Sequence, residues 1–182
     1  MFRWVLYLFG FERLGIALSD LYFVDPSAKP GEEGPERGAR VELRYLERRR
    51  ARGSKYASGP ILVGRPIWRV DLLESVENPG TLDRAHVHPV MRRWNPGNRR
   101  FEPELTADPL GWLGEQLHHP EELIDAAGVS DEGLSRDFEQ IRANSSEIVE
   151  VIRRLLERIG NGELGAAPRD APEGKLVRSG WL

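Results

Sequence analysis

The chain has 182 residues, enough for one hydrophobic core, and its 40% hydrophobic and 30% charged residues are typical of a globular protein in water. A formal net charge of −3 excludes a global attraction to nucleic acid or acidic lipid, so any such site must be a local patch. The absence of cysteine excludes disulfides, thiol nucleophiles and thiolate metal ligands.

The amino end, "MFRWVLYLFGF", is apolar but short. A membrane span needs about 18–20 apolar residues, and Glu12 and Arg13 interrupt this run. It also lacks the small-residue cleavage site of a signal peptide. We therefore expect a strand or helix that packs on the core, and a cytoplasmic protein without a membrane partner.

The first half of the chain predicts strands joined by turn-rich links. Residues 15–25 are typical of a strand, and residues 25–39, dense in Pro, Gly and Glu, indicate an exposed loop. Apolar and polar residues then alternate in three segments, at 40–49, 66–74 and 82–89. Short polar links between alternating strands favour an antiparallel meander with one face in water.

The second half changes to helical spacing. Asp108 is a suitable N-cap before Pro109, and a second helix begins at Pro120 and ends before Gly128. Apolar residues at helical spacing predict a long amphipathic helix at 134–159.

Strands followed by helices indicate the α+β class. We expect one domain over residues 1–160, with an antiparallel sheet in the first half packed by the C-terminal helices. A loosely structured tail follows at 161–182, where Gly, Pro and charged residues are frequent.

If the three alternating strands are neighbours, their polar residues share one surface. In the third strand, "LDRAHVHP", Ala85 and Val87 would point inward. The predicted polar face consists of Arg40, Glu42, Arg44, Arg69, Asp71, Arg84, His86 and His88.

This face contains the residue types that metal-independent RNA cleavage requires. Imidazole titrates near neutral pH, so His86 and His88 could serve as base and acid. Arg84 and Arg69 would stabilise the charge on phosphate, with Asp71 beside them. The predicted catalytic set therefore needs no cofactor and no metal.

A basic segment, "MRRWNPGNRRF", follows this strand. Arginines with interleaved aromatic residues suit phosphate contacts and base stacking, which predicts RNA binding through Arg44, Arg92, Arg93, Trp94 and Arg99. A solvated turn with an aromatic anchor is the alternative for this segment.

Metal binding is a second possibility for the histidines. His86 and His88 lie one residue apart on a strand, so both could reach one ion. A third ligand would come from Asp71 across the sheet, or from His118 and His119, which are more typical of cap or loop residues.

The spacing resembles the first motif of cupins, in which Gly, five residues and His-x-His precede a Glu. Gly80 and the pair His86 and His88 fit that motif, but Arg92 and Arg93 stand where the Glu is expected. An arginine there would repel a cation, which puts a cupin-like ion in doubt.

The run that contains "PIWRVDLLE", "DRAHVHP", "WNPGNRRF" and "ADPLGWLGEQL" resembles an uncharacterised family of small actinobacterial proteins. Its pattern is an Arg-Asp strand, an Asp-Arg-x-His-x-His-Pro strand and an Asp-Pro-x-x-Trp helix. The resemblance covers roughly residues 40–128 and implies a domain, not an activity. A fainter likeness to bacterial toxin nucleases implies RNA as substrate and an antitoxin-like protein as partner.

The sequence thus leaves three hypotheses open, and with them the question of whether the protein is an enzyme. The first is a toxin-type, metal-independent ribonuclease. The second is a non-catalytic regulatory or interaction protein, a homodimer through helix 134–159. The third is a metal-binding protein that uses His86 and His88.

Overall fold

The computed structural model describes residues 5–49, 53, 59–130 and 132–167. The tail predicted at 161–182 lies outside these residues from position 168 onward. In the part that is described, no helix is both long and apolar enough to cross a membrane.

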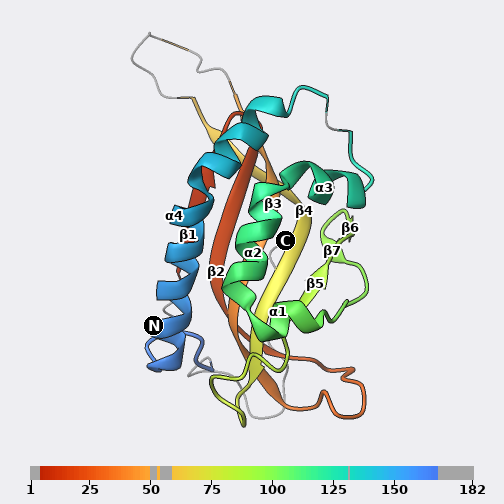
Figure 1. Cartoon of the computed structure of the whole chain (residues 1–182), viewed down its shortest axis with the longest axis vertical. Coiled ribbons are helices and arrows are strands. Elements are labelled where there is room, and N and C mark those ends of the chain that lie inside the picture. Colours follow the sequence, from red (N-terminus) through yellow and green to blue (C-terminus); the bar gives the residue numbers. More distant parts are fainter. Residues whose placement is uncertain (1–4, 50–52, 54–58, 131, 168–182) are drawn as a thin grey trace.

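The first half of the chain forms a five-stranded antiparallel sheet in which neighbours in sequence are neighbours in space (Figure 1). This confirms the predicted meander. Its strands are β1 (Leu6–Gly10), β2 (Leu14–Val24), β3 (Pro35–Arg48), β4 (Ile61–Ser75) and β5 (His86–His88). A small hairpin, β6 (Met91–Arg92) with β7 (Asn95–Pro96), follows β5.

The helices follow in the second half, which confirms the α+β class. They are α1 (Pro103–Ala107), α2 (Pro109–His118), α3 (Pro120–Ala126) and α4 (Ser135–Gly160). The predicted cap is present, since the Asp108 side chain accepts a hydrogen bond from the Gly111 N–H at 3.0 Å. In Figure 1, α2 and α4 run side by side along one face of the sheet.

The hydrophobic core lies between these helices and the sheet. Val41, Val70 and Val87 stand opposite one another on β3, β4 and β5, and all three are fully buried. Trp68 of β4 stacks on Trp112 of α2 with ring centroids 6.2 Å apart. The apolar stripe of α4 is buried in the same core, so it is used inside the chain and a dimer would need another surface.

Three predicted strand boundaries differ from the structure. Strand β4 begins at Ile61 and not at residue 66. Strand β3 begins at Pro35, inside the loop predicted at 25–39, because residues from Pro35 onward pair with β2 and β4. Strand β5 is only three residues long, whereas we expected a strand over 82–89. A turn precedes it, in which the Ala85 N–H donates to the carbonyl of Leu82 at 2.9 Å and Leu82 has a φ of 48°.

The expectation that the second face of the sheet lies in water is wrong around β5. His86, Asp71 and His88 are only 1%, 2% and 5% exposed. The chain after β5 returns to cover them, because Val87 and Arg100 form a backbone bridge and Phe101 packs on His86 with ring centroids 5.7 Å apart. We call residues 89–101 the covering segment.

Candidate functional site

Strand register assembles the candidate site. On the face opposite the helices, residues of β3, β4 and β5 stand side by side in two rows, which we call the polar rows. The first row is Arg40, Asp71 and His86, and the second row is Glu42, Arg69 and His88.

Opposite charges alternate across the rows. Arg40 donates to both oxygens of Asp71, from Nε at 2.7 Å and from Nη2 at 3.0 Å. Burial acts to raise the pKa of Asp71, but the charge and hydrogen bonds of Arg40 hold it well below its usual range. In the second row Glu42 accepts from Arg69 at 2.8 Å and from Arg44 at 2.7 Å. All four charges of the rows are therefore compensated within the sheet.

Backbone carbonyls fix the protonation of both imidazoles. His86 Nδ1 lies 2.7 Å from the carbonyl oxygen of Arg84, and His88 Nδ1 lies 2.8 Å from that of Gly97. A carbonyl oxygen only accepts, so each Nδ1 carries the proton and donates it. Each Nε2 is then a bare acceptor in the neutral ring.

These two bare nitrogens converge with a carboxylate oxygen. The Nε2 atoms of His86 and His88 are 3.1 Å apart, and they lie 3.5 Å and 3.8 Å from Oδ2 of Asp71. The circle through these three atoms has a radius of about 2.0 Å, which is the length of a zinc–nitrogen or zinc–oxygen bond. Among the residues that the structure describes, this is the one His/Asp/Glu cluster with metal-ligand geometry.

At neutral pH no proton bridges these three acceptor atoms. Burial lowers the pKa of His86 to about 4, although Asp71 acts in the opposite direction. Burial also lowers the pKa of His88. Both rings are therefore neutral, and three lone pairs face one another without a hydrogen between them. A cation at their centre removes that repulsion.

The structure brings together four of the five predicted catalytic residues: Arg69, Asp71, His86 and His88. Arg84 is different, because it lies in the turn before β5 and contacts His86 through its carbonyl oxygen. Its Nε is buried without a hydrogen-bond partner among the described residues, 3.8 Å from Oδ2 of Asp83.

The predicted RNA-binding residues also differ from one another in their contacts. The guanidinium of Arg44 lies over the Trp94 ring at 5.6 Å, while Arg92 and Arg93 are exposed on the small hairpin. Arg99 is already engaged, since its guanidinium contacts Glu36 at 3.1 Å.

Four further participants were absent from the predicted catalytic and binding sets: Arg40, Glu42, Phe101 and the Gly97 carbonyl. The alternation of β3 had placed Arg40 and Glu42 on the polar face, so that signal was available. The sequence around Gly97 gives no signal of this role, because its carbonyl reaches His88 only when the covering segment is folded.

His118 and His119 stand apart from this cluster, at the junction of α2 and α3, where His118 ends α2 and His119 caps both helices. His118 Nδ1 contacts the carbonyl of Gly114 at 2.7 Å, and His119 lies 3.2 Å from Glu115. They form part of the helix ends, as their sequence context indicated.

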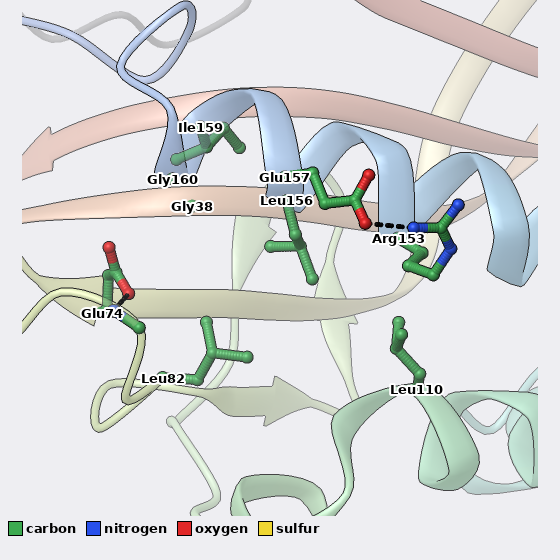
Figure 2. A pocket seen from close by; sticks show the side chains of 10 residues that line it. Gly38, Glu74, Leu82, Leu110, Arg153, Leu156, Glu157, Ile159 and Gly160 are labelled. Atoms are coloured by element: carbon green, nitrogen blue, oxygen red, sulfur yellow. Dashed lines mark hydrogen bonds and ion pairs between the residues drawn. The ribbon is translucent and has the colours of Figure 1, made fainter.

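A cavity of about 300 Å³ lies on the other side of the sheet, beneath the C-terminal end of α4. Figure 2 shows that leucine side chains from α2, α4 and the turn before β5 line it. Its charged groups are paired, because Glu74 binds the Gly80 N–H and Glu157 binds Arg153. We therefore place the candidate site at the polar rows.

No family profile, curated protein or solved structure matches the chain. The likeness to a small actinobacterial family stays a prediction, and functional inference rests on the geometry of the polar rows.

Proposed function

We propose that the protein binds one divalent transition-metal ion through Nε2 of His86, Nε2 of His88 and Oδ2 of Asp71. The observation that supports this most strongly is the convergence of three unprotonated acceptor atoms, 3.1 to 3.8 Å apart, around one point. Such a set repels itself when empty and is satisfied by a single cation.

The surroundings of the three atoms resemble the outer shell of known metal sites. Metal-bound histidines typically donate their second ring N–H to a carbonyl or carboxylate, which orients the ring. Both histidines do so here, toward the carbonyls of Arg84 and Gly97. Arg40 likewise fixes the carboxylate plane of Asp71.

The donor set favours a particular class of ion. Two imidazoles and one carboxylate suit zinc, iron and similar transition metals, whereas magnesium and calcium prefer all-oxygen sites. Three protein ligands leave at least one coordination position open, as in catalytic rather than structural zinc sites.

Metal content tests the proposal. The protein is stripped with a chelator, reloaded with Zn²⁺, desalted and measured by elemental mass spectrometry. We expect one zinc per chain, and loss of most of it in His86→Ala/His88→Ala. The matched control is His118→Ala/His119→Ala, which removes two histidines outside the site and should retain the zinc. Equal zinc content in the two double variants contradicts the proposal.

Ribonuclease activity is a second candidate, favoured by Trp94, which is 49% exposed beside Arg44. His86 Nε2 faces His88 and Asp71, an orientation that suits a ligand better than a general base.

Cleavage of RNA with and without EDTA distinguishes the two mechanisms. Activity that EDTA abolishes supports metal-dependent cleavage. Activity that resists EDTA but is lost in His86→Ala/His88→Ala supports the metal-independent mechanism. An unaltered rate in the double variant contradicts both.

A further inference from the structure

We infer that the metal ion carries one small oxyanion, of the carboxylate or phosphate class, as an exogenous ligand next to the polar rows. This inference rests on the proposed metal site and deepens it. It follows from the charges that surround the three ligand atoms and from their burial.

The polar rows are electrically balanced before a metal enters. They hold two arginines, Arg40 and Arg69, and two carboxylates, Asp71 and Glu42. Histidines that bind a metal are neutral, so they add no charge. A divalent ion therefore brings two positive charges that no side chain of the rows cancels.

Nearby carboxylates are not free to cancel these charges. Glu42 is shared, because Arg69 contacts its Oε1 and Arg44 its Oε2. Glu36 is engaged by Arg99 through both oxygens, at 3.1 and 3.3 Å. In the described part of the chain, Asp71 is thus the one carboxylate within reach of the ion.

Burial makes this excess charge costly. Asp71 and His86 are almost fully enclosed, and uncompensated charge in such surroundings carries a large desolvation penalty. An anion bound to the metal lowers this penalty and also fills the open coordination position.

A titration of the cobalt-loaded protein tests the inference. Co²⁺ replaces zinc and reports changes in its ligands through visible absorption. The protein is titrated separately with acetate and with inorganic phosphate, at an ionic strength held constant with sodium perchlorate. We expect a saturable spectral change with at least one of them, and the effective anion identifies the carboxylate or the phosphate class.

Glu42→Gln provides the charge test. Removal of this carboxylate leaves the rows one charge more positive, so the anion should bind about 3- to 30-fold more tightly. Glu47→Gln is the matched control, because Glu47 lies on the same strand with its side chain 70% exposed, and its anion affinity should equal that of the wild type.

The outcomes separate the inference from the proposed function. Cobalt that binds normally but shows no response to either anion overturns the inference and leaves the metal site intact. Cobalt that does not bind overturns both. A response that Glu42→Gln fails to strengthen overturns the charge argument, and the wild-type titration remains decisive if that variant does not fold.

Discussion

Asp71 is the residue on which the site depends at the smallest scale. Its carboxylate accepts a hydrogen bond from Arg40 of β3 and faces both histidines of β5. Residues of three strands therefore meet at one side chain. The alternation of β4 placed it on the polar face, beside Arg69. Its burial was not predictable in this way, because it depends on the return of the covering segment.

We predict that Asp71→Asn weakens zinc binding by at least tenfold. The amide removes the anionic ligand and leaves Arg40 with one acceptor oxygen instead of two, so the site loses a negative charge and the contact that orients the ligand. Isothermal titration of the metal-free protein with Zn²⁺ measures the change. Asp125→Asn, at an exposed position of α3, serves as the control and should bind as the wild type does.

The metal-free protein should lose stability as the pH falls from about 6.5 to about 4. In the unfolded chain His86 takes up a proton below its ordinary pKa of 6.5, whereas burial lowers the pKa to about 4 in the folded chain. Protonation therefore favours unfolding across this window, by an amount on the order of 1–3 kcal/mol.

Urea unfolding at several pH values measures this loss. His86→Gln should flatten the pH dependence, whereas His118→Gln, at the exposed end of α2, should leave it as in the wild type. An unchanged slope in His86→Gln would show that burial of this ring is not its cause.

At the scale of elements, β3 and β4 were the most predictable part of the sheet. The alternation of apolar and polar residues in these strands predicts which side chains pack against the helices. Val41 and Val70 lie on the predicted buried face. Strand β5 was harder, because the turn at Leu82 shortens it. The histidine tautomers could not be derived at all, since His88 is fixed by a carbonyl nine residues later.

A long-range contact joins the helical layer to the sheet. Asp137, fully buried in the first turn of α4, accepts hydrogen bonds from the N–H groups of Arg13 and Leu14 at 2.9 and 2.8 Å. This contact holds the start of α4 against the turn between β1 and β2.

Asp137→Ala should lower the free energy of unfolding by about 2–3 kcal/mol, because two backbone donors lose their acceptor. Asp137→Asn keeps one acceptor oxygen and should cost less. Chemical denaturation compares both with Glu139→Ala, an exposed neighbour on α4 that should change stability little. An Ala variant as stable as this control would show that the contact is not stabilising.

At the scale of the whole molecule, the sheet separates two environments. Helices cover one face (Figure 1), with the apolar core beneath them. On part of the other face, the covering segment encloses charged and imidazole groups. A metal bound to His86, His88 and Asp71 would link β4 to β5, and through the Gly97 carbonyl to the covering segment. Metal binding should therefore stabilise the whole fold.

Zinc at about 100 times its dissociation constant should stabilise the protein by about 2.7 kcal/mol, which corresponds to a rise in Tm of about 5–10 °C. Thermal denaturation with and without Zn²⁺ measures this shift, and excess EDTA should reverse it. His88→Ala should unfold at the same temperature under both conditions. A wild-type Tm that zinc leaves unchanged would contradict a site formed only in the folded chain.

Anomalous diffraction at the zinc edge, from crystals grown with Zn²⁺, tests the central claim most directly. We predict one strong peak per chain, about 2.0–2.2 Å from Nε2 of His86, Nε2 of His88 and Oδ2 of Asp71. No peak between these atoms, or a peak only at His118 and His119, would contradict the assignment of the polar rows as a metal site.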